Sequence, residues 1–176
     1  MIQFVTLGFA AADADHRVRE VGGNNFGPRI KQYLDSLDPP LKQGAPWCAA
    51  FVQYCSDRAA KVLGKPNPLD AVKHEALVQS YYDHFEKFVV PGERATKSGF
   101  YPEPGELVLF KFPVGGKPAD RWNHIGIVAQ YPSQGSPIFW CIEGNTGDVD
   151  QRDGDGVYLK PRDMSKYPTC FIRWGA

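Results

Sequence analysis

The sequence lacks several features that would assign it to a specialised class of protein. Its 20 Lys and Arg residues balance 20 Asp and Glu residues, so the formal net charge is zero at pH 7. A dedicated nucleic-acid-binding protein would carry a basic excess, so no nucleic-acid partner is expected. No apolar run approaches the ~20 residues of a membrane-spanning helix, and no membrane anchor is expected. The chain also has no repeat, no low-complexity tract and no linker long enough to separate two domains.

The sequence has four cysteines, and their spacing argues against two common uses. No Cys-x-x-Cys pair is present, so a structural zinc site is not expected. The spacing is not that of a small disulfide-stapled scaffold either. Free thiols are the default, with three of the four in the core. The four cysteines are Cys48, Cys55, Cys141 and Cys170. An even count in an exported protein would permit disulfides, so the disulfide state of Cys55, Cys141 and Cys170 stays open.

The N-terminal segment lacks the basic residues that open a signal peptide. Residues 2–12 are apolar and lead into Ala-Ala-Asp-Ala, which gives a faint likeness to such a peptide. Without the basic residues, we interpret the segment as the first helix of the domain. A targeting remnant remains the alternative, and the sequence does not reveal an export route.

The patterns that are present predict an α+β domain spanning residues 1–176. Hydrophobic residues make up 43% and charged residues 23%, which is ordinary for a globular protein with a real core. Helical spacing of apolar residues dominates before residue 95, and strand-like alternation dominates after it. We therefore expect N-terminal helices packed on a C-terminal antiparallel sheet of about five or six strands. The expected helices lie near residues 7–18, 28–37 and 49–62 and within 69–85, and the strands at 106–112, 124–129, 137–143, 156–160 and 169–174.

One cysteine stands at the start of a predicted helix. Cys48 lies in Gly44-Ala-Pro-Trp-Cys-Ala-Ala-Phe-Val52, where Pro46 marks the beginning of the helix. Unpaired backbone N–H groups and the helix dipole favour an anion at this position, and the anion of cysteine is the nucleophilic thiolate. A packed core residue is the alternative, and it is the interpretation we keep for Cys55, two turns further on.

A thiol nucleophile needs a base, and the base needs an orienting partner. His124 opens a predicted strand after a polar loop, whereas the other three histidines fall in polar helical stretches. Glu143 and Asn145 end the next strand and, two residues apart, are expected to face the same way. Either could then reach the imidazole of His124. Turn or strand-capping roles are the alternatives for His124 and Asn145.

The order of these residues is that of a papain-like thiol hydrolase site, and the local motifs are more specific. The chain resembles the CHAP domain, the cysteine- and histidine-dependent amidohydrolases and peptidases of the NlpC/P60 superfamily. The resemblance covers about residues 15–175. It rests on Gly44-Ala-Pro-Trp-Cys-Ala-Ala-Phe-Val, Asn123-His-Ile-Gly-Ile-Val and Glu143-Gly-Asn-Thr, with support from Glu20-Val-Gly-Gly-Asn-Asn-Phe-Gly27 and Pro104-Gly-Glu-Leu-Val-Leu-Phe110.

The resemblance implies a papain-like fold and a peptidoglycan hydrolase. Members of the family cleave amides of the stem or cross-bridge peptide, or the bond between N-acetylmuramic acid and L-alanine. Cys48 would be the nucleophile and His124 the general base and then acid. Glu143 would orient His124, with Asn145 as a helper or alternate. Action at the cell wall would follow, from the periplasm, by secretion or by phage release, with no cofactor.

Some family members bind calcium just before the cysteine, but the matching stretch here, residues 35–44, has only two poorly placed aspartates. Residues 147–156 look more like a calcium loop, yet they lack the Glu that closes an EF-hand. We expect a solvated hairpin there and no metal site. Trp47, Trp122 and Tyr101 could line a substrate groove, or only cover the core. Glu20, Asn24 and Asn25 are expected to cap the second helix rather than touch substrate.

Two other functions remain open from the sequence. One is an amidase acting on a small peptide or a glutathione-type conjugate, and the other is an inactive wall-binding module. The protein is expected to act as a monomer with peptidoglycan as its partner. As a toxin delivered into rival cells it would also need an immunity or inhibitor protein. The sequence does not distinguish that role from a phage lysin or a housekeeping enzyme, nor does it name the bond that is cut.

Overall fold

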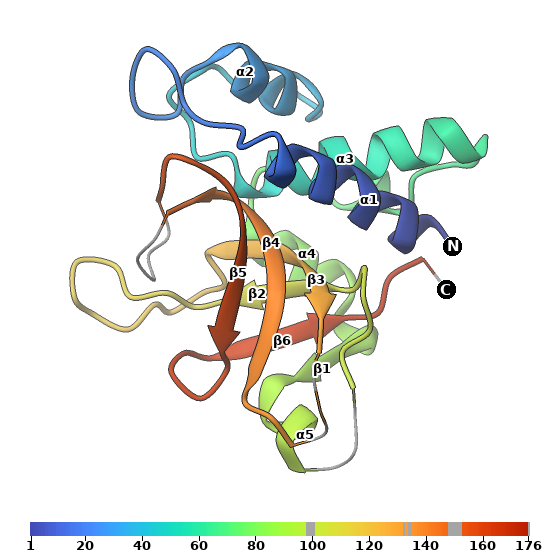
Figure 1. The fold of residues 1–176 in the computed structure, drawn as a ribbon, viewed down its shortest axis with the longest axis vertical. Coiled ribbons are helices and arrows are strands. Elements are labelled where there is room, and N and C mark those ends of the chain that lie inside the picture. Colours follow the sequence, from blue (N-terminus) through green and yellow to red (C-terminus); the bar gives the residue numbers. More distant parts are fainter. Residues whose placement is uncertain (98–100, 132, 134, 148–152, 176) are drawn as a thin grey trace.

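The computed structural model describes residues 1–97, 101–131, 133, 135–147 and 153–175, and the chain forms an α+β fold (Figure 1). In these described ranges, five α-helices and two 3₁₀ turns precede or flank one sheet. The helices are α1 (Ile2–Asp15), α2 (Pro28–Asp35), α3 (Cys48–Leu63), α4 (Val78–His84) and α5 (Gly92–Lys97), and the 3₁₀ turns are Pro68–Ala71 and Glu86–Phe88. The strands are β1 (Val89–Pro91), β2 (Leu107–Phe110), β3 (His124–Gln130), β4 (Ile138–Thr146), β5 (Gly156–Asp163) and β6 (Thr169–Ile172).

The six strands form one antiparallel sheet in the order β1-β6-β2-β3-β4-β5. The predicted α+β class and antiparallel sheet are confirmed. All five expected strands are present within a few residues of their predicted limits. The strand β1 and the helix α5 were not predicted, because three-residue and six-residue elements carry too little periodicity to be recognised.

The predicted start and end of α3 follow from local residue chemistry. Gly64 closes the helix in a left-handed conformation with φ of 61°, and its N–H group donates to the carbonyls of Ala60 and Lys61. A residue with a side chain adopts this conformation only at a cost, so glycine is favoured at this position. At the other end Trp47 is the N-cap residue and Cys48 is the first helical residue.

The expectation of a first helix in residues 2–12 is also confirmed, since α1 runs from Ile2 to Asp15. Its first turn lies beside the end of the chain, where the side chain of Gln3 donates to the carbonyl of Trp174. Within the described ranges, no helix is long and apolar enough to cross a membrane. All four cysteines are free and buried.

Hydrophobic clusters cover both faces of the sheet. On one face α1 and α3 lie side by side and pack on the central strands (Figure 1). This face carries Leu107, Leu109, Ile125, Ile127, Ile142 and Ile172. The other face carries a second cluster, made chiefly of Val108, Phe110, Phe112, Val128, Phe139 and Phe171. Because side chains alternate along a strand, every second residue of β3 and β4 belongs to the second face.

The approach of α3 to β4 depends on the absence of a side chain at Gly144. A Cβ atom built there would lie 2.6 Å from Cβ of Phe51 and 2.8 Å from Cζ3 of Trp47. Both neighbours are buried in the core and have little room to move. Gly144 therefore sets how closely the N-terminal end of α3, with Cys48, packs against the sheet.

We predict that Gly144→Ala lowers the free energy of unfolding by about 1–3 kcal/mol, the usual cost of overpacking a core. Gly8→Ala is the matched control, because no atom lies within 4 Å of a Cβ at this helical position. It should leave stability unchanged or raise it by about 0.5–1 kcal/mol, since alanine favours helix over glycine. Urea unfolding of both variants measures the difference, and equal effects would contradict the close approach.

Candidate active site

Cys48 lines a cavity of about 540 Å³. It is the first residue of α3 and its side chain is 5% exposed. The N-cap residue Trp47 provides no side-chain cap, so the first-turn N–H groups of α3 are available to an anion. The cavity walls come from the loop before α3, from α4 and from the loop before β3: Leu41, Pro46, Cys48, Ala76, Leu77, Val78, Gln79, Ser80, Asp83, Arg121, Trp122 and Asn123.

His124 is the first residue of β3 and is fully buried. Its Nε2 lies 2.7 Å from Oε2 of Glu143, so the proton of a neutral ring belongs on Nε2. Nδ1 has no hydrogen-bond partner among the described residues and is the atom left to take a proton from a thiol. Among the described residues, no hydrogen bond joins Nδ1 to Cys48, and catalytic hydrogen bonds are often long in the absence of substrate.

The charge state of His124 is set by opposing effects. Burial alone would lower the pKa of the imidazole, because it removes water from the charged form. The neighbouring Cys48 side chain and then the Glu143 carboxylate act in the other direction, and they raise the pKa to about 9. Among the effects that raise the pKa, that of Cys48 is larger than that of Glu143.

Glu143 is fully buried on β4 and is held by four donors from three strands. Arg162 on β5 donates from Nε to Oε1 at 2.6 Å and from Nη2 to Oε2 at 2.5 Å. His124 is the third donor, and the thiol of Cys141 is the fourth, 2.8 Å from Oε1. Burial would raise the pKa of Glu143, but the bonds from Arg162 and His124 outweigh it and hold the pKa well below its usual range.

Sequence reasoning did not find Arg162. The predicted strand ended at residue 160, whereas β5 continues to Asp163 and places Arg162 opposite Phe139 of β4. The available signal was alternation, since Tyr158, Lys160 and Arg162 are spaced to share one face of β5. A basic residue on that face, beside a buried acid on the neighbouring strand, is a candidate ion pair.

Cys48, His124, Glu143 and Arg162 form a row of ionisable groups in which each acts on the next. Side chains on the second face of the sheet pack around His124, Glu143 and Arg162. Glu143 reaches His124 across Gly126, where a Cβ atom would lie 2.7 Å from Cγ of Glu143. Phe112 lies beside both cations, with its ring centre 5.3 Å from that of His124 and 4.9 Å from the Arg162 guanidinium. Phe110 packs on the same two groups. The aromatic wall keeps water away and strengthens the electrostatic interactions inside the row.

Asn145 does not face His124, which corrects its assignment as a helper or alternate orienter. The register of β4 and β5 shifts between Glu143 and Thr146, and Asn145 has a φ of 54°. This bulge breaks the strand alternation on which the expectation was based. With its amide oriented to suit its neighbours, Asn145 donates to Gly154 O at 3.0 Å and Asn25 Oδ1 at 3.1 Å, and accepts from the N–H of Trp47 at 3.2 Å.

The segment before α2 supports the cysteine loop instead of capping α2. The N-cap of α2 is Gly27, and no side chain caps the helix, so the expected capping by Glu20, Asn24 and Asn25 is wrong. Glu20 accepts the indole N–H of Trp47 at 2.9 Å. The Asn25 side chain donates to Gly44 O at 3.3 Å, while the Gly44 N–H donates to Asn25 O at 3.0 Å.

Of the three aromatic candidates for the groove, only Trp122 lines the cavity. Its ring stacks on Tyr82 with centres 5.4 Å apart, and its backbone N–H donates to the side-chain oxygen of Gln79 at 3.0 Å. Trp47 has no exposed surface and stacks on Tyr33, so it belongs to the core.

Tyr101 lies elsewhere. Its ring contacts Tyr131, which follows the last residue of β3, whereas His124 is the first. Seven residues of strand separate the two ends by roughly 20 Å. The expected groove position of Tyr101 is therefore corrected.

Nothing in the described part of the chain groups three or more metal-ligating His, Cys, Asp or Glu side chains. Residues 148–152 of the loop that was compared with a calcium site lie outside the described residues. The prediction of a solvated hairpin there stays a prediction.

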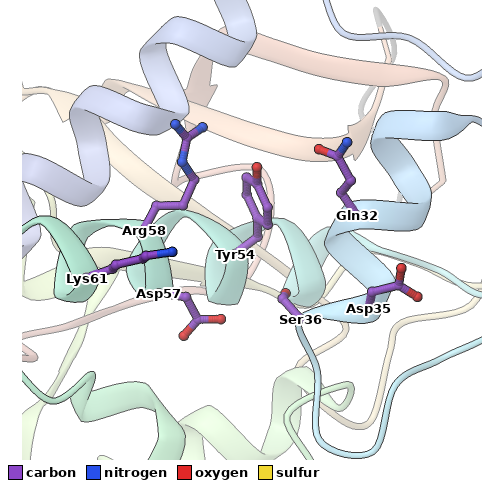
Figure 2. A pocket seen from close by; sticks show the side chains of 7 residues that line it. All are labelled: Gln32, Asp35, Ser36, Tyr54, Asp57, Arg58 and Lys61. Atoms are coloured by element: carbon purple, nitrogen blue, oxygen red, sulfur yellow. The ribbon is translucent and has the colours of Figure 1, made fainter.

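A second cavity of about 390 Å³ lies between α2 and α3, away from Cys48. Its walls are Gln32, Asp35, Ser36, Tyr54, Asp57, Arg58 and Lys61, and Figure 2 shows Arg58 and Tyr54 directed to one side of α3 and Asp57 to the other. Burial, then repulsion from Asp70 and Glu75, raises the pKa of Asp57 to about 6, against a hydrogen bond from Asn67. No cysteine or histidine is among the residues that line this cavity.

Comparisons of the chain with protein-family models, with curated proteins and with solved structures find no match. The chemistry that the site can perform is therefore argued from its geometry. A thiol at a helix start, a histidine with one nitrogen oriented and one free, and an ionised carboxylate form the arrangement needed for nucleophilic acyl transfer. The adjoining cavity leaves room for a carbonyl group beside the sulfur.

We predict that iodoacetamide modifies Cys48 at neutral pH well before the other three thiols. Cys55, Cys141 and Cys170 are no more than 2% exposed, and burial raises the pKa of each. His124→Ala should slow labelling of Cys48 by about 10²-fold, at the low end of what a positioned base contributes. Timed labelling with peptide mass spectrometry measures both effects. Labelling of Cys55 as fast as Cys48 would count against an activated thiol.

Proposed function

We propose that this chain is a cysteine amidohydrolase that cleaves an amide bond of peptidoglycan. The observation that carries the proposal is the row Cys48, His124, Glu143 and Arg162, with its open end at a cavity. The helices packed on an antiparallel sheet, with the thiol on a helix start and the base on a strand start, support a papain-like arrangement. The resemblance of the local motifs to the CHAP domain supports the wall substrate.

In the proposed reaction Nδ1 of His124 holds the proton given up by Cys48, and the raised pKa of about 9 favours this imidazolium at neutral pH. The resulting thiolate attacks the carbonyl carbon of the scissile amide. The oxyanion that forms is held by backbone N–H groups at the start of α3, including that of Cys48, where the helix dipole favours negative charge. The fixed Nε2 contact with Glu143 keeps Nδ1 directed at the sulfur throughout.

Collapse of the tetrahedral intermediate expels the amine, and the His124 imidazolium donates its proton to that leaving group. A thioester remains on Cys48. Neutral His124 then takes a proton from water, and the hydroxide attacks the thioester carbonyl. The Cys48 thiolate is expelled as the leaving group, and the carboxylic acid product is released. With a pKa of about 9, the imidazolium is available as the acid at neutral pH.

The cavity suits a peptide with both apolar and polar groups. Leu41, Leu77 and Trp122 offer apolar surface, while Asp83 and Arg121 offer one charge of each sign. Stem and cross-bridge peptides of the wall combine short apolar side chains with free carboxylate and amino groups. This match favours cleavage within the peptide over recognition of the sugar chain alone.

The direct test is digestion of purified, cross-linked peptidoglycan by the wild type and Cys48→Ala, with the fragments identified by mass spectrometry. We expect wild-type products that the variant does not release, and their masses name the bond that is cut. If neither protein releases products while Cys48 still reacts with iodoacetamide, the wall substrate is wrong. The same assay on soluble peptides and glutathione conjugates then tests the smaller amide substrates.

Trp122 provides a test of the cavity as the substrate site. Trp122→Ala should raise KM about 2- to 10-fold, because an aromatic contact contributes about 0.5–1.5 kcal/mol, with a smaller effect on kcat. Tyr101→Ala is the matched control, since Tyr101 is also a partly exposed aromatic residue but does not line the cavity. Steady-state hydrolysis of a soluble peptide that contains the bond identified by the digest measures both variants. A larger effect at Tyr101 than at Trp122 would place the substrate elsewhere.

A further inference from the structure

We propose that Arg162 is a positioning residue that keeps Glu143 ionised and thereby extends the reactivity of Cys48 to neutral and mildly acidic pH. The inference rests on the proposed role of Cys48 as a nucleophile, but it does not depend on peptidoglycan as the substrate. Arg162 acts through Glu143 and His124, since it has no contact with the cavity.

Arg162 binds both carboxylate oxygens of Glu143. Nε binds Oε1 at 2.6 Å and Nη2 binds Oε2 at 2.5 Å, while Nη2 also lies 3.2 Å from the Thr146 hydroxyl. A guanidinium that binds both oxygens fixes the plane of the carboxylate as well as its position. Oε2 is the oxygen that accepts from His124, so Arg162 also fixes the imidazole.

The charge count of the row shows why a guanidinium is needed. With the proton on His124, the row holds a thiolate, an imidazolium, a carboxylate and a guanidinium, and its net charge is zero. With the proton on Cys48 the net charge is again zero. The proton can therefore pass between sulfur and ring without leaving an uncompensated charge in a buried site, which would be costly.

Removal of Arg162 would disturb this balance in one direction. The ion-pair state would carry a net charge of −1 in a site lined by Phe110 and Phe112. A buried row with excess negative charge takes up a proton at higher pH than a neutral one does. The extra proton would reside on Glu143 or on Cys48, and either location lowers the fraction of oriented, reactive thiolate.

The other groups that face Glu143 do not replace Arg162. On its own strand, Cys141 donates a neutral S–H group to Oε1. From β3 comes His124, and Cys48 of α3, which acts on His124, would add negative charge as a thiolate. From β5 Lys160 acts on Cys141 at longer range, while its Nζ donates to the carbonyl of Gly147. Arg162 is thus the permanent cation in direct contact with the carboxylate.

The experiment measures the rate of Cys48 alkylation by iodoacetamide from pH 4.5 to 9 without any wall substrate. The proteins are the wild type, Arg162→Met, which keeps side-chain length without charge, and Arg162→Lys, which keeps the charge with one donor group. We expect the acid limb of the Arg162→Met profile to move up by about 1–3 pH units, the usual effect of an adjacent opposite charge. Arg162→Lys should recover part of that shift.

Arg173→Met is the matched control. Arg173 also binds a buried glutamate, with Nε 2.8 Å from Oε1 of Glu106, but that pair does not contact the row. Its alkylation profile should coincide with the wild type. If folded Arg162→Met also coincides with the wild type, Arg162 only supports the fold and the proposal is overturned.

A double variant covers the case in which Arg162→Met does not fold. Glu143→Gln leaves the guanidinium buried without its counter-ion, so adding Arg162→Met should restore stability to thermal unfolding. The double variant should also show the same slow alkylation as Glu143→Gln alone, because Arg162 has no carboxylate left to act on. A further loss of stability or a further slowing in the double variant would overturn the proposal.

Discussion

The arrangement of the candidate site depends on the carboxylate of Glu143, which is fully buried and ionised. Glu143 stays ionised in the interior only because donors from β3, β4 and β5 converge on it, and each of those donors is fixed by the sheet. The burial makes the row sensitive to every charge within it, because unpaired charges in such an environment carry a large penalty. The orientation of His124, and through it the reactivity proposed for Cys48, depends on this one group remaining negative.

Two glycines and one bulge bring the parts together. Gly126 lets the Glu143 side chain cross β3, and Gly144, on the opposite face of the sheet, lets α3 approach β4. The bulge after Glu143 turns Asn145 away from the imidazole and toward the loop before Cys48. One short stretch of β4 therefore orients the base with one residue and supports the nucleophile loop with another. The segment around Glu20 and Asn25 supports the same loop, because it is hydrogen-bonded to it.

The sequence was sufficient where local chemistry decides the outcome. Gly64 and Pro46 mark the ends of α3, alternation marks the β3 strand, and both place Cys48 and His124 correctly at the starts of their elements. It was insufficient where the outcome depends on packing between elements. The bulge at Asn145 leaves no signal in strand periodicity, and Arg162 joins the row only through the register of β4 and β5. Trp47 and Tyr101 were misplaced because an aromatic residue next to a motif is equally compatible with a groove and a core.

The central claim is that Cys48 forms a covalent acyl intermediate, and intact-mass spectrometry during turnover tests it most directly. Wild-type protein mixed with excess muropeptides or soluble peptide amides and quenched in acid within milliseconds to seconds should gain the mass of one acyl group. Proteolysis should place the added mass on the peptide that contains Cys48, and hydroxylamine should remove it, as expected of a thioester. Product release without any adduct on Cys48, or an adduct that persists in Cys48→Ala, would contradict the account.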